Sequence, residues 1–153
     1  MWSRSIELDW PRRVVLLEAL VAADAEDPWL VELAASWRSG ASPRVFAARL
    51  QSWFQDEVRW VPDSKFGALE VFRGPWLVLE SREGDCDCQA RAVAAILRAG
   101  GVASGLRYLV DDDGAPLHVF PVVLLGGDVV ALETTIHAEI GEHPDRALAR
   151  TGG

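Results

Sequence analysis

The order of the predicted helices and strands is the feature that most constrains the fold of this chain. Helical periodicity dominates the chain up to Gly100-Gly101, where the last helical run, which begins at Asp85, ends. The segments that follow are predicted as three strands: 104–110, 117–125 and 128–135. Helices that precede strands in this way favour an α+β architecture, with an antiparallel sheet packed against the helix that starts at Cys86.

Three earlier helices are predicted from their start signals. Asp9 and Pro11 precede the first helix, Asp27-Pro28 the second and Ser42-Pro43 the third, while Gly40 is expected to end the second. Apolar residues then recur at helical spacing on one side of each helix: Val14, Leu17 and Val21; Trp29, Leu33 and Trp37; Phe46, Leu50, Phe54 and Val58.

The length of 153 residues suits a single domain with a hydrophobic core of its own. We predict N-terminal helices over residues 1–44, a core over residues 45–136 and a peripheral tail over residues 137–153. Residues 61–83 contain several prolines and glycines and are predicted to be irregular.

Charge and cysteine content narrow the class of protein. The net charge of −8 argues against a nucleic-acid partner, which normally requires a basic surface. The N-terminal segment lacks the apolar stretch of a secretory signal, and no apolar run has the length of a membrane span, so no membrane partner is expected. The only two cysteines are two positions apart, which disfavours a disulfide between them. We therefore expect a reduced, cytoplasmic compartment.

Cys86 is the residue with the clearest chemical potential. It lies in the segment Gly84-Asp85-Cys86-Asp87-Cys88-Gln89. Asp85 is a natural N-cap, so Cys86 is expected in the first helical turn, where backbone N–H groups and the helix dipole favour a thiolate. A backbone N–H group near Cys86 could also bind a developing oxyanion. The alternative is a buried cysteine with a purely structural role.

A histidine and a carboxylate follow the cysteine, in the order of a nucleophile, its base and the acid that orients the base. They are His118 and Glu133, in the last two predicted strands. If Gly126-Gly127 forms a hairpin turn, Leu125 opposes Asp128, and His118 and Glu133 become diagonal neighbours on one face. Their Cβ atoms would then be roughly 7 Å apart, within reach of an imidazole and a carboxylate.

Pro121 introduces an alternative to this register. Proline cannot donate a backbone hydrogen bond and prefers a strand edge or a bulge. A bulge at Pro121 would shift the pairing by one residue and move Glu133 to the other face of the sheet. His118 would then be a half-buried structural histidine, and Glu133 a charge that protects a sheet edge.

Three segments together resemble the transglutaminase-like superfamily, in its compact bacterial and phage versions. Their pattern is a G-D-C-D-D motif that opens a helix, a strand with His before a small residue and an aromatic one, and a strand ending in an L-D-P-T-like segment. The matching segments are Gly84-Asp85-Cys86-Asp87-Cys88-Gln89-Ala90, His118-Val119-Phe120 and Ala131-Leu132-Glu133-Thr134-Thr135. The stretch from Trp60 to Arg82 is similar to the lead-in of these domains. The resemblance covers residues 45–136, and the N-terminal helices loosely.

The resemblance implies a papain-like core with a catalytic triad. It assigns Cys86 as the nucleophile, His118 as the base and Glu133 as the acid that orients the base. Three further candidates for the oxyanion site or the substrate groove are Trp60, Asp87 and Cys88.

The sequence departs from the family pattern at four positions. Cys88 replaces the second Asp of the motif, where a carboxylate would suit the helix terminus. Glu133 replaces an Asp and has a longer side chain, which must fold back to reach the same ring nitrogen. Thr134 stands where proline is common, and Pro121 stands where relatives carry an ordinary residue. None of these changes removes the triad, but together they leave room for weak or altered activity.

The leading interpretation is a cysteine-dependent acyl-transfer enzyme that hydrolyses a peptide or side-chain amide bond through a thioester. Hydrolysis is favoured over cross-linking because no feature marks a site for a second amine. The substrate would be a protein or a peptide. A second interpretation is a weak or inactive module that acts in protein binding or assembly, including assembly of a phage particle.

A metal site is the third interpretation. Cys86, Cys88 and His118 offer soft ligands, with His137 and His143 further along the chain. Their spacing lacks the paired ligands of structural zinc motifs. We therefore expect neither a metal nor another cofactor.

Overall fold

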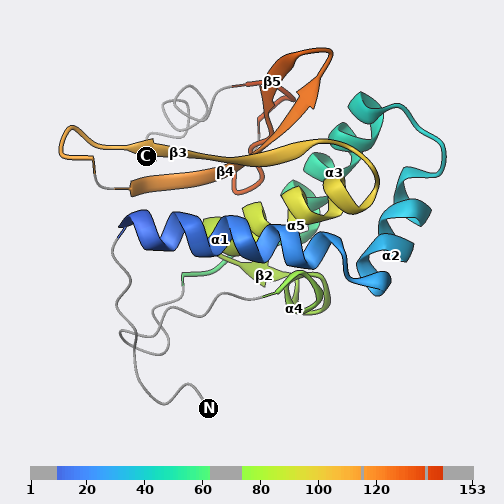
Figure 1. Ribbon diagram of the computed structural model, residues 1–153, viewed down its shortest axis with the longest axis horizontal. Helices are drawn as coiled ribbons and strands as arrows, with labels where there is room; N and C mark the ends of the chain where they lie inside the picture. The colour runs from blue at the N-terminus through green and yellow to red at the C-terminus, as the bar shows by residue number, and fades with distance from the viewer. Residues whose placement is uncertain (1–9, 63–73, 115, 137, 143–153) are drawn as a thin grey trace.

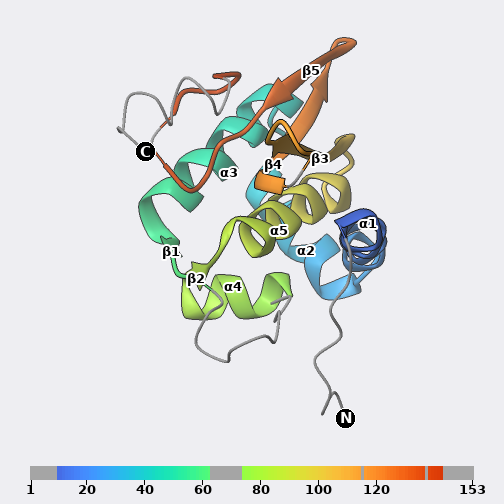
Figure 2. The same cartoon turned by 90° about the vertical axis from the view of Figure 1, so that its left-hand side faces the viewer.

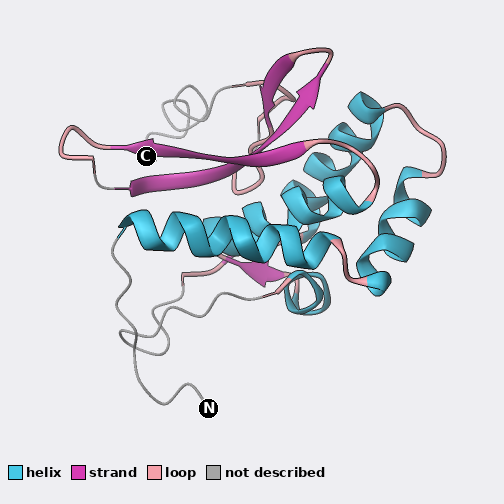
Figure 3. Cartoon of the chain, viewed as in Figure 1, coloured by secondary structure: helices cyan, strands magenta, loops and turns pink. Residues whose placement is uncertain are grey.

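The computed structural model describes residues 10–62, 74–114, 116–136 and 138–142. Helix α5 (Cys86–Ala99) lies at the centre, and the other helices and the sheet surround it (Figures 1 and 2). None of the helices in these ranges is long and apolar enough to cross a membrane. The surrounding helices are α1 (Trp10–Ala25), α2 (Pro28–Arg38), α3 (Pro43–Glu57) and α4 (Pro75–Ser81). Figure 3 shows the helices on one side of the long strands, and along the chain all the helices precede the three-stranded sheet, which confirms the predicted α+β class.

Helix α5 is buried on nearly all sides, a wider burial than the single apolar face that its periodicity predicts. Every residue from Cys88 to Leu97 is buried, because α1, α2 and α4 cover the helix on one side and the sheet covers it on the other. Small alanine side chains let these elements approach closely. Arg91 is buried as well, and its guanidinium donates to both carboxylate oxygens of Asp24 in α1, at 2.6 and 2.9 Å. This ion pair fixes α1 against the central helix.

The end of α5 packs tightly enough to give a testable stability effect. A Cβ atom added at Gly100 would lie 2.6 Å from Cε2 of Phe46, whose ring is fully buried. We expect Gly100→Ala to lower the free energy of unfolding by about 1–3 kcal/mol, the usual cost of overpacking a core. Urea denaturation would measure this. Gly105→Ala is the control, because its added Cβ meets nothing closer than 3.9 Å. Equal stabilities of the two variants would contradict this account.

The predicted helix starts are confirmed at three caps. The side chain of Asp27 accepts a hydrogen bond from the backbone N–H of Trp29, and Ser42 accepts one from that of Val45. Asp85 accepts one from the backbone N–H of Cys88 at 2.9 Å. Each side-chain oxygen satisfies an N–H group that has no partner within its own helix, so these short polar residues fix where the helices begin.

The predicted apolar face of α2 is wrong by one position. Leu30 and Ala34 are fully buried, whereas Trp29 is 41% exposed. Leu33 and Trp37 are only partly buried at the edge of the core. Apolar residues occur on several sides of α2, so spacing alone could not identify the side that faces α5.

The prediction that residues 61–83 are irregular is also wrong in part. Pro75 is the first residue of helix α4, which ends at Arg82 in a left-handed conformation with φ of 56°. Proline suits the first turn of a helix, so Gly74-Pro75 marks a helix start here and not a continuing loop. Residues 63–73, which make up about half of the family-like lead-in, lie outside the described residues.

The sheet has the order β3-β4-β5, and its register confirms the predicted hairpin. The pair Leu125–Asp128 flanks the turn, and regular pairing continues to Val122 and Ala131. The alternative, a bulge at Pro121, is not what the pairing shows: the irregularity lies between Leu109 and Val110. The three strands are β3 (Ser104–Val110), β4 (Pro116–Leu125) and β5 (Asp128–Ala131).

Pro121 is tolerated in a central strand because its nitrogen, which carries no hydrogen, faces the point where pairing with β5 stops. Its carbonyl accepts from the N–H of Leu132 at 2.9 Å, so its nitrogen faces Leu132 as well. Pro121 cannot return this hydrogen bond. The ladder stops there, and β5 ends at Ala131 instead of continuing to residue 135 as predicted. The chain is thus free to turn before Glu133.

The segment after the sheet packs back onto the core. Ile140 contacts the hydrophobic core, and the N–H of Gly141 donates to the carbonyl of Ala131 at 2.9 Å. Residues 143–153 of the predicted tail lie outside the described residues. The predicted division of the chain into 1–44, 45–136 and 137–153 stays a prediction.

Candidate active site

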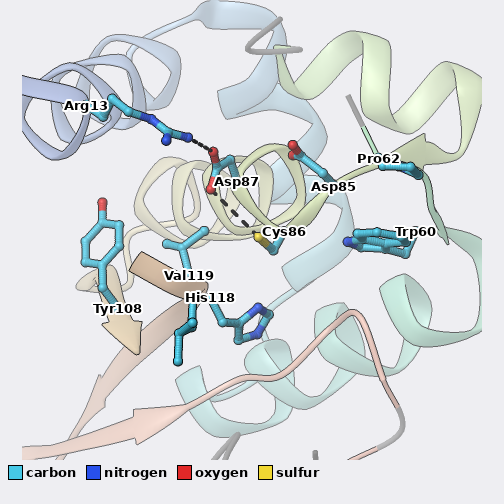
Figure 4. Close-up of a pocket in the computed structure, with 10 residues that line it drawn as sticks. Arg13, Trp60, Pro62, Asp85, Cys86, Asp87, Tyr108, His118 and Val119 are labelled. Carbon is cyan, nitrogen blue, oxygen red and sulfur yellow. Dashed lines mark hydrogen bonds and ion pairs between the residues drawn. The ribbon is translucent and has the colours of Figure 1, made fainter. Parts of the chain in front are cut away.

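Cys86 and His118 face the same pocket from two different elements. Cys86 is the first residue of α5, and His118 lies on β4 (Figure 4). The pocket has a volume of about 240 Å³, large enough for a side chain or a short stretch of peptide backbone. Its lining residues come from α1, β1, α5, β3 and β4: Arg13, Trp60, Pro62, Asp85, Cys86, Asp87, Tyr108, Leu117, His118 and Val119.

His118 and Glu133, the predicted neighbours, are in direct contact. Nε2 of His118 lies 2.7 Å from Oε2 of Glu133, and the two side chains are 10% and 1% exposed. The ring of Phe120 lies nearly parallel to that of His118, with the centroids 6.2 Å apart. Nε2 is thus held by the carboxylate, which leaves Nδ1 as the ring nitrogen that could exchange a proton.

The other oxygen of Glu133 is fully engaged. Oε1 accepts from the backbone N–H groups of Thr134 and Thr135 at 2.9 Å each, and from the hydroxyl of Thr135 at 2.8 Å. Burial alone would raise the pKa of Glu133, but the hydrogen bond and charge of His118, with the bonds from Thr135, outweigh burial and lower that pKa. Glu133 is therefore ionised at neutral pH, which favours the tautomer of His118 with the proton on Nε2.

The position of Cys86 at a helix start was expected to favour its thiolate form. Its surroundings instead favour the protonated thiol. Burial and the nearby carboxylate of Asp87 raise the pKa of Cys86 to about 12, although the backbone N–H of Val119 acts in the other direction. Oδ1 of Asp87 lies 3.8 Å from Sγ, and its Oδ2 is 3.1 Å from a guanidinium nitrogen of Arg13. Cys86 is thus a thiol at rest, and it needs a base to become a nucleophile.

Asp87→Asn tests this electrostatic account. Removing the carboxylate takes away a negative charge beside the thiol and leaves the positive charge of Arg13, so the pKa of Cys86 should fall below about 12. The measurement is the pH dependence of Cys86 alkylation by iodoacetamide, followed by mass spectrometry. Cys88, which is 1% exposed, is the internal control in the same spectra. An unchanged alkylation curve would show that the carboxylate of Asp87 does not raise the pKa of Cys86.

The three additional candidates occupy different positions. Trp60 and Asp87 line the pocket, and in Figure 4 the indole nitrogen of Trp60 points toward Cys86. Trp60 is placed there by β1 (Arg59–Trp60), which pairs in parallel with β2 (Glu83–Gly84) directly before α5. Cys88, by contrast, belongs to the hydrophobic core and not to the lining of the pocket.

Several residues at or behind the pocket were not anticipated from the sequence. Arg13 and Tyr108 line it, and Gln51 and Gln55 of α3 contact the segment that carries Glu133. A polar residue such as Gln51 on an otherwise apolar helical face was the one available signal. Within the described ranges, no group of three or more His, Cys, Asp or Glu side chains could hold a metal ion. The alternative ligands His137 and His143 lie outside those ranges.

No family model matches the sequence, and no curated protein sequence matches it either. Solved structures do. A candidate protease from Parabacteroides distasonis aligns with a TM-score of 0.58 at 15% identity, over 76% of this chain and 25% of that one. A candidate cysteine protease from Cytophaga hutchinsonii aligns with a TM-score of 0.58 at 14% identity, over 84% of this chain and 43% of that one.

The periplasmic domain of TgpA from Pseudomonas aeruginosa, solved with bound ethylmercury, is a third match. It aligns with a TM-score of 0.53 at 21% identity, over 76% of this chain and 49% of that one. The chain has a transglutaminase-like fold. The chain spans only a quarter to a half of the length of the structures that it matches. At these identities the likeness concerns the fold alone.

Proposed function

We propose that the protein is a cysteine-dependent acyl-transfer enzyme that hydrolyses an amide bond of a protein or peptide. The observation that carries the proposal is the contact between His118 and a buried, ionised Glu133, at the wall of a pocket that also exposes Cys86. A buried carboxylate that holds one ring nitrogen of a histidine leaves the other nitrogen to act as a base toward a thiol. The likeness to candidate cysteine proteases supports the same class of chemistry.

The proposed reaction begins with the thiol form of Cys86. Nδ1 of His118 takes the proton of Cys86 as Sγ attacks the carbonyl carbon, and Glu133 stabilises the imidazolium that forms. The tetrahedral oxyanion accepts hydrogen bonds at the start of α5, with the indole N–H of Trp60 as a further donor. The carbon–nitrogen bond then breaks, and His118 returns the proton to the leaving amine. Water, deprotonated by His118, finally hydrolyses the thioester and regenerates the thiol.

One observation favours a second candidate function, a weak or inactive module that binds proteins. The pKa of Cys86 is about 12, so the free protein holds almost no thiolate at neutral pH. If His118 does not accept the proton, the pocket is a binding groove only. The cytoplasmic compartment and the absence of a second-amine site for cross-linking remain predictions in either case.

An activated-ester assay tests the proposal without knowledge of the natural substrate. The full chain is incubated with 4-nitrophenyl acetate, and release of nitrophenolate and the mass of the Cys86 peptide are followed. We expect a transient acetyl thioester on Cys86 that water hydrolyses, and no acetyl group on the buried Cys88. Cys86→Ala is expected to abolish both signals. Acetylation no faster than that of glutathione would favour the binding module instead.

A further inference from the structure

Two glutamine side chains of α3 hold the backbone that carries Glu133. Nε2 of Gln51 lies 3.1 Å from the carbonyl oxygen of Glu133 and 3.5 Å from that of Glu139. Nε2 of Gln55 lies 2.9 Å from the same Glu133 oxygen, 3.2 Å from that of Ile136 and 2.8 Å from that of Ala138. Four backbone carbonyls of one segment therefore converge on two side-chain amides, which we call the glutamine clamp.

The chemistry of the partners fixes the orientation of both amides. Each partner of the clamp is a carbonyl oxygen, which can only accept a hydrogen bond, so the NH₂ ends of Gln51 and Gln55 must face them. Neither glutamate nor an apolar residue could replace these donors, because a carboxylate would face carbonyl oxygens and an apolar residue would leave them unsatisfied. Gln51 is only 4% exposed, so water has little access to replace it.

The glutamine clamp holds the backbone at Glu133, which the sheet does not reach. Because β5 ends at Ala131, no strand ladder holds the backbone at Glu133. The hydrogen bonds from Thr134 and Thr135 orient the carboxylate, but they belong to the same segment and would move with it. The hydrogen bonds that tie the carbonyl of Glu133 to the rest of the molecule come from Gln51 and Gln55.

We propose that Gln51 and Gln55 are positioning residues, which act through Glu133 to keep His118 in the orientation and tautomer that acyl transfer at Cys86 requires. This inference rests on the proposed function. Loosening the clamp moves Glu133 away from Nε2 of His118 by a small distance, and small displacements behind a catalytic group are known to reduce rates strongly. Loosening the clamp is therefore expected to change which ring nitrogen of His118 carries the proton, and through that change to lower the rate.

The test uses ¹⁵N-histidine-labelled full-length protein, with His118→Asn to assign the His118 signals. In the wild type, the ring shifts should report a single tautomer with the proton on Nε2, because that atom donates to Glu133. In Gln55→Met and Gln51→Met, we expect a mixture of tautomers.

The rate is the second measurement on the same variants. We expect acetylation of Cys86 by 4-nitrophenyl acetate to slow by about 10–100-fold, the usual effect of losing a residue that orients a site. If Gln55→Met does not fold, the smaller Gln55→Ser, which admits water at this part-buried position, gives the second variant.

Arg38→Gln is the matched control. Arg38 also donates to backbone carbonyls, those of Ala41 at 2.9 Å and Gly100 at 2.7 Å, but at the opposite end of α5 from Cys86. It should lower stability without changing the tautomer of His118. A single Nε2–H tautomer and an unchanged rate in the glutamine variants would overturn the proposal. An equal loss of rate and of the single tautomer in Arg38→Gln would overturn it as well.

A separate outcome bears on the proposed function. A wild type with the Nε2–H tautomer but without acetylation of Cys86 would overturn that function. The tautomers of the variants would then still decide whether the clamp positions His118.

Discussion

Replacing His118 by alanine is expected to slow acetylation of Cys86 by a factor on the order of 10²–10⁴, the usual contribution of a positioned general base. The reason is that Cys86 starts as a thiol: burial and Asp87 raise its pKa to about 12, so attack at neutral pH depends on a group that removes the proton. His118 faces the same pocket and is held by Glu133. The initial rate of nitrophenolate release from 4-nitrophenyl acetate measures the effect.

The pH dependence of the acetylation rate distinguishes a role of His118 as a base from a purely structural role. With His118 absent, the residual reaction should depend on the thiolate of Cys86 alone and rise with pH toward about 12. Leu124→Ala is the control, because Leu124 lies on the same strand, is 46% exposed and is not part of the pocket lining. Parallel rate–pH curves for the wild type and His118→Ala would show that His118 does not activate Cys86.

Glu133→Ala should lower the free energy of unfolding by about 1–3 kcal/mol, the usual cost of leaving a buried hydrogen-bonding group without its partner. The substitution removes the acceptor of three hydrogen bonds, including those from the buried backbone N–H of Thr134 and from Thr135. It also leaves His118 without its carboxylate. Urea denaturation at neutral pH measures the change, with Asp128→Ala as a control at an exposed carboxylate in β5.

The same substitution has a defined pH dependence. The pKa of Glu133 in the folded protein is below its ordinary value of 4.5, so ionised Glu133 stabilises the folded state above that pH. This contribution is lost as pH falls through the folded-state pKa. The difference in unfolding free energy between the wild type and Glu133→Ala should therefore be largest above about pH 4.5 and shrink in acid. A difference that stays constant with pH would mean that packing, and not the charge of Glu133, stabilises this region.

Local signals in the sequence were sufficient for three of the helix starts and for the hairpin, but not for the start of α4. A short polar side chain before a helical run, as at Asp27, Ser42 and Asp85, has few roles other than capping. Gly126-Gly127 between apolar segments defines a hairpin turn, and once the turn is fixed, counting along the strands gives the register. Counting from this turn brought Glu133 beside His118, although the ladder itself ends at Ala131, two residues before Glu133.

The features that sequence reasoning missed depend on packing in three dimensions. Whether Trp29 or Leu30 faces the core depends on where α5 lies. The spacing of apolar residues in α2 gives no information about that position. The high pKa of Cys86 arises from burial and from the way that Asp87 folds back, although a helix start by itself favours a thiolate. The contact of Gln55 with carbonyls more than seventy residues away leaves no local pattern.

The arrangement of the pocket around α5 separates the parts of the chain that can vary from those that cannot. The proposed nucleophile begins the most enclosed of the described helices, whereas the rim of the pocket includes Leu117, which is 67% exposed. Substitutions of exposed side chains usually change stability by less than about 0.5 kcal/mol. Under the proposed function, substrate preference could therefore change through substitutions at the rim while the helix that carries Cys86 stays intact.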